Sequence, residues 1–507
     1  MIAKVTSAAV VGLDAVPVEV EVNIIKKGLP AFHIVGLPDK AVSEAKERVR
    51  SAILTIGAQF TAARIVVNLA PADLPKEGPA FDMAIAIGIL IADEQIETDV
   101  SDAVFIGELS LDGNIRHTAG ILPFALMARE KGHKRLFVPV TDAREASIVN
   151  GISVFGIESL DVLAGYLRGA VTLHPHEHIE FRDMQQYADS VFDMADVKGQ
   201  EQAKRALEIA AAGGHNMMMR GVPGAGKTML ARAFPSILPT LTETEALEVT
   251  RIYSITGNLP PGTSVVKSRP FRSPHHTTSR IGLIGGGSRP MPGEISLAHR
   301  GVLFLDELPE FPKTTLEALR QPIEDGIVSI ARAAGQVTYP AQFILIAAAN
   351  PCPCGNFGSK TKKCACMPGQ IVRYKRQVSG AILDRIDLHV YCPELSPDQL
   401  SHLPPGEPSS DIRQRVEKAR DLQRTRFAGT RLQSNAEMTS KDIRTYCALT
   451  DDCIELLKQA VVRYALSARS YHKMIKVART IADLRGVADI VSSDIAEALR
   501  YRIKEEE

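Results

Sequence analysis

The stretch that decides the fold reads Gly221-Val222-Pro223-Gly224-Ala225-Gly226-Lys227-Thr228. A strand-like run at residues 216–220, with three methionines at its centre, precedes it, and a helix-forming run from Met229 follows it. In this strand–loop–helix context, glycines let backbone N–H groups face phosphate oxygens, and the helix N-terminus adds positive charge. We therefore predict an ATP-binding loop over residues 221–229, with Lys227 on the β- and γ-phosphates and Thr228 on Mg²⁺. A chance glycine turn is the alternative.

Two acids close a second apolar run of the chain. Residues 302–305 are followed by Asp306 and Glu307, and Asp306 comes 79 residues after Lys227. In phosphate-loop enzymes the Mg²⁺ partner stands at the carboxyl edge of the sheet, so Asp306 is expected to hold hydrated Mg²⁺ and Glu307 to orient the attacking water. A strand followed by two acids is common, but its combination with the glycine loop is specific.

Polar residues at two further places are expected near the nucleotide. A third apolar run, residues 343–349, ends at Asn350, beside the expected position of the γ-phosphate. Simple capping of that strand before Pro351 is the alternative. Residues 196–200 begin this α/β unit and are well placed to lie over the adenine.

The composition is that of a packed multidomain chain. Its 507 residues exceed what one hydrophobic core usually fills, and 45% of them are hydrophobic. Lys plus Arg equals Asp plus Glu at 59 each, so contact with a polyanion must come from local clusters. The longest apolar run, residues 83–92, is far shorter than the ~20 residues of a membrane helix. Since the N-terminus also lacks signal-peptide features, we expect a soluble cytoplasmic protein.

Changes in sequence pattern predict three domains and two linkers. Residues 1–168 mix strand-like and helix-like segments, which is typical of an α/β domain, and residues 169–195 lose periodicity. The second α/β unit covers residues 196–393, and a Pro- and Ser-rich linker covers residues 394–410. Residues 411–507 carry helical patterns only. The predicted fold class is therefore α/β with a C-terminal all-α domain.

Alternating apolar and polar residues predict half-buried strands in two places. Residues 4–22 are expected to form one strand, and residues 326–330 and 336–339 the two strands of a hairpin with Arg332 near its tip. A glycine-rich segment at residues 280–289 precedes this hairpin.

Four of the seven cysteines fall in one short segment, as Cys352-x-Cys354 and Cys364-x-Cys366, with nine residues between the pairs. Four thiolates are the set that tetrahedral Zn²⁺ prefers. A structural zinc site is the favoured interpretation, and free thiols are the alternative because C-x-C is less common than C-x₂-C in zinc knuckles.

Several blocks in a fixed order carry a family resemblance. They are Gly221 to Thr228, Pro274-His275-His276, Gly293-Glu294-Ile295-Ser296-Leu297-Ala298-His299, residues 302–308, Asn350-Pro351-Cys352-Pro353-Cys354-Gly355 and Leu383-Asp384-Arg385-Ile386-Asp387-Leu388. With these blocks the chain resembles, essentially from end to end, the ComM (YifB) family of Mg-chelatase-like AAA+ ATPases. The resemblance implies a central AAA+ core, a C-terminal helical lid and an N-terminal domain of the Lon-protease-like (S5-type, ChlI-type) fold.

The resemblance also implies that each site is completed by an arginine from a neighbouring subunit of a homohexameric ring. Arg385 matches the trans-acting finger of related helicase ATPases, with Arg376 as the fallback, and Arg469 matches the second sensor arginine of the lid. An arginine near the γ-phosphate makes a large contribution to phosphoryl transfer. Arginines with only a structural role are the alternative for each position.

For function, the resemblance implies an ATP-dependent hexameric motor on DNA, a helicase that drives branch migration and promotes integration of DNA in natural transformation and recombination. Arg332 would then meet DNA phosphates in the central channel, without sequence preference, and a plain surface hairpin is the alternative. The alternative is a chelatase-like ATPase that remodels a protein partner. An active protease is disfavoured, because Ala80 stands where Lon has its serine and no lysine occupies the base position around residues 120–122.

Overall fold

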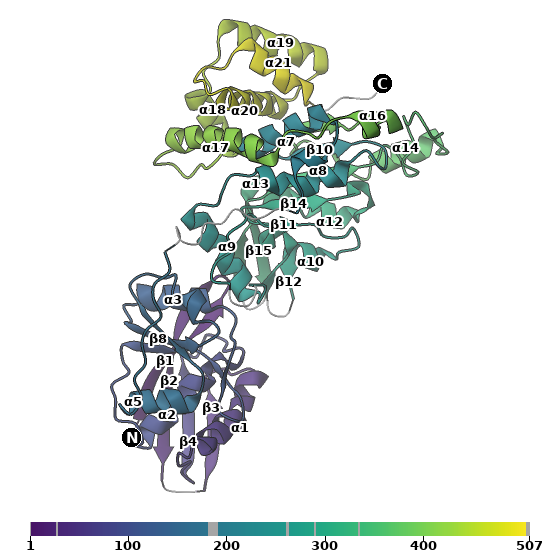
Figure 1. Cartoon of the computed structure of the whole chain (residues 1–507). Coiled ribbons are helices and arrows are strands. Elements are labelled where there is room, and N and C mark those ends of the chain that lie inside the picture. Colours follow the sequence, from purple (N-terminus) through teal and green to yellow (C-terminus); the bar gives the residue numbers. More distant parts are fainter. Residues whose placement is uncertain are drawn as a thin grey trace. The chain divides into compact units, whose positions relative to one another are not determined.

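The computed structural model describes residues 2–26, 29–180, 191–259, 263–287, 290–332 and 335–502. They form two compact units, shown in Figure 1. Unit 1 comprises Met1–Gln186 and Glu243–Lys267, and unit 2 comprises Tyr187–Thr242 and Ser268–Glu507. Within the described ranges, no helix has both the length and the apolar character needed to span a membrane.

A seven-stranded sheet with the order β3-β4-β2-β1-β5-β8-β9 forms the centre of unit 1. Its strands are β1 (Ile2–Val11), β2 (Asp14–Ile25), β3 (Ala31–Val35), β4 (Arg64–Ala70), β5 (Ala103–Phe105), β8 (Arg135–Pro139) and β9 (Ser153–Ile157). The prediction of one strand over residues 4–22 is wrong, because β1 and β2 pair as an antiparallel hairpin. Gly12 makes the reversal possible with a left-handed φ of 65°.

The core of unit 1 is built around a helix that is buried on nearly all sides. This helix, α2 (Asp82–Ala92), packs against β1 and β2 and has an almost entirely apolar sequence. Asp82 in its first turn is paired with Arg48 of α1 (Lys40–Thr55), with 2.6 Å between Nε and Oδ2. A buried carboxylate needs such a partner, because burial alone disfavours its charge.

Helix α9 (Glu243–Ile255) belongs to unit 1, although it follows the glycine loop in sequence. It packs against α3 (Ile121–Glu130), where the N–H of Gly120 donates to the carbonyl of Ser254 at 3.1 Å. Buried Glu145 accepts a hydrogen bond of 2.8 Å from the N–H of Leu122 in the same region. Burial raises the pKa of Glu145 to about 7.

Unit 2 contains a five-stranded sheet in which every pairing is parallel, with the order β11-β14-β17-β10-β18. Its strands are β10 (Met217–Arg220), β11 (Phe271–Arg272), β14 (Val302–Leu305), β17 (Ile344–Ala349) and β18 (Leu388–Tyr391). The three middle strands are short and almost wholly apolar, as expected of strands covered on both faces. Since all strands run the same way, the loops that follow β10, β14 and β17 lie at one edge of the sheet.

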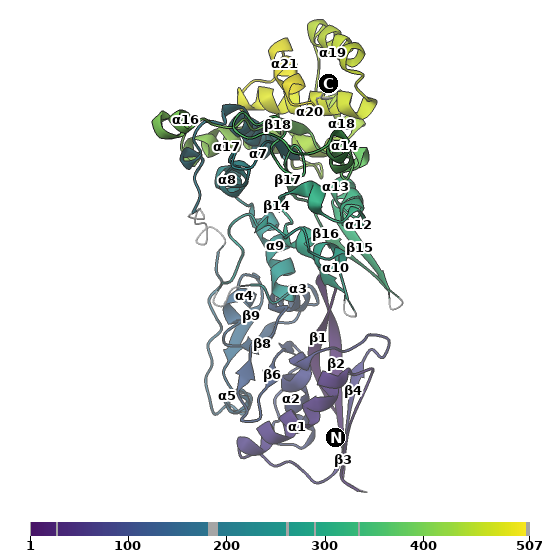
Figure 2. The same ribbon diagram turned by 90° about the vertical axis from the view of Figure 1, so that its right-hand side faces the viewer.

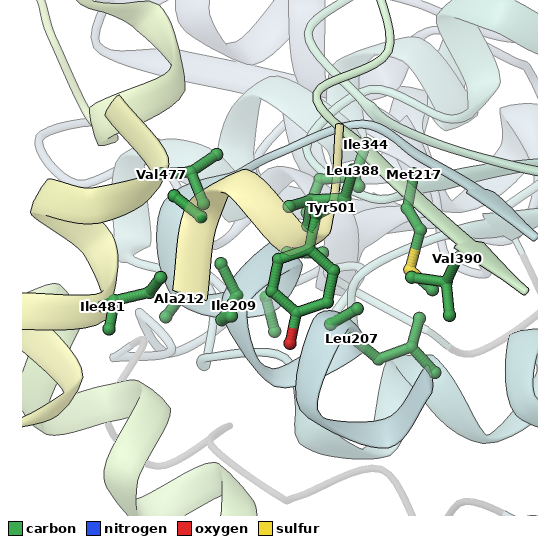
Figure 3. Close-up of a cluster of buried hydrophobic side chains, with 14 of the residues drawn as sticks. Leu207, Ile209, Ala212, Met217, Ile344, Leu388, Val390, Val477, Ile481 and Tyr501 are labelled. Atoms are coloured by element: carbon green, nitrogen blue, oxygen red, sulfur yellow. The ribbon is translucent and has the colours of Figure 1, made fainter. Parts of the chain in front are cut away.

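Helices from the end of the chain share one core with this sheet. The C-terminal helices are α17 (Ser409–Arg426), α18 (Ser440–Tyr446), α19 (Asp451–Tyr464), α20 (Ala468–Leu484) and α21 (Ser492–Arg500). Figure 3 shows Val477 and Ile481 of α20 and the ring of Tyr501 beside Leu207 and Ile209 of α7 (Glu201–Gly213). The helical lid is therefore continuous with the core of the sheet through side chains that exclude water.

Two β-hairpins of unit 2 lie side by side, as Figure 2 shows. One joins β12 (Gly285–Gly286) to β13 (Met291–Pro292), and the other joins β15 (Ile327–Arg332) to β16 (Gly335–Pro340). The hydroxyl of Tyr339 in β16 donates to the carbonyl of Pro290 at 2.7 Å and ties the two together.

Candidate nucleotide site

The glycine loop connects β10 to α8 (Lys227–Ala233) at the carboxyl edge of the sheet. Gly224 and Gly226 have left-handed φ values of 82° and 89°, which a residue with a side chain rarely adopts. Gly221 is required for a different reason, since a Cβ atom there would lie 2.4 Å from the carbonyl oxygen of Cys392. The glycines therefore fix both the curvature of the loop and its close approach to the end of β18.

Buried Lys227 folds back over the loop that precedes it. Its Nζ donates to the carbonyls of Gly221 at 2.7 Å and Val222 at 3.0 Å and to Oδ1 of Asn350 at 3.1 Å. Burial lowers the pKa of Lys227, while the nearby thiol of Cys392 and the acids Asp306 and Glu307 act in the opposite direction. Among the described residues, the direct hydrogen-bond partners of the ammonium group are thus neutral oxygens, which makes it a strong binding point for an anion such as a phosphate.

The predicted magnesium ligands also come together. Thr228 Oγ1 donates to Asp306 Oδ2 at 2.8 Å, although the two residues belong to different elements. The other oxygen of Asp306, Oδ1, accepts from the N–H of Glu307 at 2.9 Å. A hydroxyl and a carboxylate beside a phosphate-binding loop are the oxygen ligands that Mg²⁺ prefers. The donor set therefore fits this metal.

Glu307 has an unusual backbone conformation with a left-handed φ of 50°. Such a conformation is costly for a residue with a side chain and is concentrated at functional sites. Its carboxylate is half exposed, and His276 Nδ1 lies 3.6 Å from Oε2. His276 belongs to the Pro274-His275-His276 block, for which the sequence suggested no role, because nothing local shows that it meets Glu307.

Gln200 is a second residue near the loop for which the sequence suggested no specific contact. Its backbone is also left-handed, with a φ of 60°, and its side-chain Nε2 donates to the carbonyls of Ala225 at 3.0 Å and Pro393 at 2.8 Å. The expected adenine segment, residues 196–200, is therefore tied directly to the glycine loop and to the end of β18. Met229, by contrast, has a half-exposed side chain in the first turn of α8.

Arg385 lies at the opposite edge of the sheet from the glycine loop. It comes just before β18, where the N–H of Asp387 donates to the carbonyl of Asn216, the residue that precedes β10. The four residues of β10 span about 13 Å at ~3.3 Å each and separate Arg385 from residue 221. Arg376, the fallback, caps the end of α14 (Pro368–Lys375) and is exposed.

The two predicted arginines meet at one acidic residue that the sequence did not single out. Arg385 Nε donates to Glu324 Oε2 at 3.1 Å, and its Nη2 bonds the same oxygen. Arg469 Nη2 donates to Glu324 Oε1 at 2.7 Å from the first turn of α20. Arg332 ends β15, and its side chain lies outside the described part of the structure.

The four clustered cysteines converge beside the glycine loop. The Sγ atoms of Cys352, Cys354, Cys364 and Cys366 all lie within 4.8 Å of one another. Cys352 Sγ is 3.4 Å from that of Cys354 and 3.7 Å from that of Cys364. Tetrahedral Zn²⁺ with Zn–S bonds of ~2.3 Å needs S···S separations of about 3.8 Å. The thiol cluster therefore fits zinc.

Two further observations concern the surroundings of this cluster. Hydrogen bonds from the backbone N–H groups of Asn356 and Ala365 lower the pKa of the Cys354 thiol to about 6, whereas burial and the neighbouring thiols raise the pKa of the Cys364 and Cys366 thiols. Gly355 has a left-handed φ of 79°, and a Cβ atom there would lie 2.5 Å from Cγ of Pro223 in the glycine loop. The cysteine loop is therefore packed directly against the glycine loop.

In unit 1, Ala80 is buried in the short 3₁₀ turn Pro79–Phe81 that leads into α2. Its methyl group stands at the position that the Lon resemblance assigns to a nucleophile, and a methyl group has no nucleophilic atom.

A parallel sheet with a glycine loop after β10, two acids after β14 and a polar residue after β17 defines a phosphate-loop ATPase of the AAA+ class. Comparison with protein families gives three matches. They are "Magnesium chelatase, subunit ChlI" over residues 193–400, "Subunit ChlI of Mg-chelatase" over residues 18–142 and "Magnesium chelatase, subunit ChlI C-terminal" over residues 406–502. The chain belongs to the ComM/YifB family of Mg-chelatase-like AAA+ ATPases.

Individual relatives cover almost the whole chain. Competence protein ComM of Haemophilus influenzae is 43% identical over 504 residues, covering 99% of this chain and 97% of that protein. Uncharacterized protein YifB of Escherichia coli is 42% identical over 503 residues, covering 98% and 96%. Lon protease 2 of Bacillus subtilis is 28% identical over 136 residues, which are 26% of this chain and 24% of that protein. The last match agrees with a Lon-like fold of the N-terminal domain.

Proposed function

We propose that this chain is an ATP-driven motor that works as a hexameric ring on DNA, as a helicase and branch-migration factor in the cytoplasm. It would promote the integration of incoming DNA during natural transformation and recombination. The observation that carries the proposal is the joined set Lys227, Asn350, Thr228 and Asp306 around the glycine loop. The name of the relative ComM, a competence protein, supports the biological context.

Each residue of the site has a defined task in ATP hydrolysis. The backbone N–H groups of Gly224 and Gly226 and the ammonium of Lys227 would bind the phosphates, and Thr228 and Asp306 would hold Mg²⁺, whose charge would offset that of the phosphates. Glu307 accepts a hydrogen bond from the attacking water and orients it toward the γ-phosphorus. Asn350 donates its amide N–H₂ to the γ-phosphate, and the Oδ1 bond to Lys227 keeps that amide in place.

The position of Arg385 supports assembly into a ring. An arginine at the amino edge of the sheet cannot reach its own glycine loop across the ~13 Å of β10. The same arginine fits a site formed by a second copy of the chain, because a guanidinium stabilises the charge that develops on the γ-phosphate. We assign Arg385 as the trans-acting finger and Arg469 as the second sensor of that shared site.

The two adjacent hairpins support a DNA substrate. Hairpin β15–β16 ends in Arg332, and hairpin β12–β13 is rich in glycine and packs beside it. Loops of this kind suit a channel that tracks a phosphate backbone without reading bases. We assign zinc in the four-cysteine cluster a structural role, and the N-terminal domain the role of a structural or DNA-binding ring without peptidase activity.

The test is ATP hydrolysis measured with no DNA, with single-stranded DNA and with branched DNA. We expect DNA to raise turnover of the parental protein and Arg332→Ala to remove most of that increase while leaving DNA-independent turnover in place. Arg463→Ala, which removes an exposed arginine from α19, is the matched control and should keep the response to DNA. The stimulation should also fall steeply as salt is raised.

The second candidate is a chelatase-like ATPase that remodels a protein partner. The observation in its favour is that all three family matches carry the name of a magnesium chelatase subunit. Under this alternative, neither single-stranded nor branched DNA changes ATP turnover, and the Arg332→Ala and Arg463→Ala variants have the same turnover. That result would overturn the DNA proposal while leaving the ATPase site unaffected.

A further inference from the structure

Glu324 joins two arginines that are far apart in the sequence. Residues 324, 385 and 469 come from α13 (Arg320–Asp325), from the turn after α15 (Gly380–Leu383) and from the lid helix α20. Arg385 and Arg469 each form an ion pair with a different oxygen of the Glu324 carboxylate. Glu324 is thus one of the acidic side chains that connect the AAA+ core to the lid.

The charge balance at this place favours binding of an anion. Arg469 sits in the first turn of α20, where the helix dipole is positive and where no acidic residue occurs. With Arg385 added, two full positive charges and the end of a helix face one carboxylate. The nearby Glu317 forms an ion pair of 3.0 Å with Arg320, so its charge balances that of Arg320 and not that of Arg385 or Arg469. Within the described ion pairs, two cations therefore share the one carboxylate of Glu324.

The bonds to Glu324 leave donors on both arginines. Arg385 directs Nε and Nη2 to Glu324 and Nη1 to the carbonyl of Ala381 at 2.6 Å. Among the described contacts, this uses three of its five N–H groups, and Arg469 uses one of five. Since the side chain of Arg469 is 49% exposed, its remaining donors can reach a group outside the protomer. The side chain of Arg385 is only 11% exposed, so Arg469 provides most of the accessible part of this site, and the Glu324 carboxylate orients both guanidiniums while leaving N–H donors on each.

We propose that Glu324 is a positioning residue, which holds Arg385 and Arg469 together as one anion-binding face for the terminal phosphate of ATP held by a second copy of this chain. Without the carboxylate, the two like charges repel each other and their side chains spread over many rotamers. The inference rests on the proposed function, because it requires that the arginines act on a neighbour. It adds that the core finger and the lid arginine operate as a unit set by one acid.

The first test compares Glu324→Gln with Glu317→Gln on the full-length protein. The two variants remove the same charge from nearby positions, but only Glu324 contacts Arg385 and Arg469. We expect Glu324→Gln to lower kcat by about 10-fold to 100-fold, because misplacement of a catalytic group by ~1 Å can cost ~100-fold. The KM for ATP should change little, because the glycine loop of the same protomer is intact. Glu317→Gln should keep the parental kcat.

Glu324→Asp tests whether a carboxylate on a shorter side chain restores part of the kcat that Glu324→Gln loses. Its kcat should lie between those of Glu324→Gln and the parental protein. Thermal melting and binding of a fluorescent ATP analogue establish that all variants are folded. A parental kcat for Glu324→Gln would overturn the inference.

The second test mixes protomers and separates this inference from the proposed function. In rings that combine Glu324→Gln with Lys227→Ala, the Lys227→Ala protomers hydrolyse nothing but offer an intact arginine face to their neighbours. Turnover should exceed the average of the two variants measured alone, and the same should hold for Arg385→Ala mixed with Lys227→Ala. If only the Arg385 mixture recovers, Glu324 does not act through the shared face and the inference fails. If neither mixture recovers, completion of the site between protomers fails.

Discussion

Thr228 Oγ1 donates a hydrogen bond of 2.8 Å to Asp306 Oδ2. Thr228 lies in the segment that follows β10, and Asp306 lies in the segment that follows β14. The contact exists because β10 and β14 run parallel and both flank β17, so that their carboxyl ends lie at the same edge. A hydroxyl next to a carboxylate at this edge is ready to receive a hydrated divalent cation. The acids that follow β14 should therefore separate into a binding function and a catalytic function.

Replacement of these two acids should have different consequences. Asp306→Asn removes a charge from the Mg²⁺ position, so the gain in ATP affinity that Mg²⁺ confers should be lost. Glu307→Gln leaves that position intact and removes the group that orients water, so affinity for Mg-ATP should stay parental while turnover falls by about 100-fold or more. Calorimetric titration with and without Mg²⁺, combined with steady-state turnover, distinguishes the two. Equal losses of affinity in both variants would contradict this division.

Lys227→Ala should remove hydrolysis almost completely. The ammonium is the buried cation that we propose to bind the phosphates, and loss of one such stabilising contact typically costs ~100-fold to 1,000-fold in rate. Phosphate release measured at saturating ATP is the assay. Lys313→Ala, which removes an exposed lysine at the start of α12 (Lys313–Glu317), is the matched control and should be neutral. Turnover at the parental rate in Lys227→Ala would exclude the assigned site.

The thiol cluster should contain about one zinc ion per chain, the stoichiometry of a four-cysteine site. We expect mass spectrometry of inorganic elements to find it in protein purified without chelators. The double variant Cys354→Ser, Cys364→Ser should lose the metal and melt at a lower temperature, because metal binding stabilises the folded state. Cys447→Ser, at a buried thiol outside the cluster, should retain the metal. Full reactivity of the cluster thiols in the native protein would argue against a bound metal.

Glu145 should make the stability of unit 1 depend on pH. Burial raises its pKa from 4.5 to about 7, so the folded state holds this proton more tightly than the unfolded chain does. The stabilisation is complete below pH ~4.5 and is lost as pH rises through ~7, with a maximal change of roughly 3 kcal/mol.

Hydrogen exchange of the α3 amides measures this effect locally. Protection, corrected for intrinsic exchange rates, should decrease from pH 5 to pH 8 in the parental protein. In Glu145→Gln, whose amide oxygen can still accept from Leu122, protection should vary much less. Identical pH profiles for the two proteins would show that Glu145 does not titrate in this range.

The sequence allowed the local elements of the site to be predicted. The strand, glycine loop and helix at residues 216–233 follow from residue type and order alone, and they appear as β10 and α8. The four cysteines that lie close together in the sequence also lie close together in space, with all Sγ atoms within 4.8 Å of one another. These features depend on neighbours in the chain, for which local pattern is a sufficient guide.

Contacts between distant segments could not be predicted in the same way. Glu324 lies in an ordinary charged helix, and its pairing with Arg385 and Arg469 depends on how core and lid pack. His276 and Gln200 likewise gain their partners only through the tertiary fold. The error at residues 4–22 has a local cause, since the alternation of side chains continues through the turn at Gly12 and conceals it.

The contact of Gly355 with Pro223 has a consequence for how this chain can diverge over generations. A side chain at position 355 collides with the proline ring, and the left-handed backbone there already disfavours any residue other than glycine. Position 355 is therefore closed to single substitutions as long as a ring occupies position 223. In a large set of descendants, we expect position 355 to change only where position 223 has already lost its ring, so that the cysteine segment can vary only after the glycine segment has.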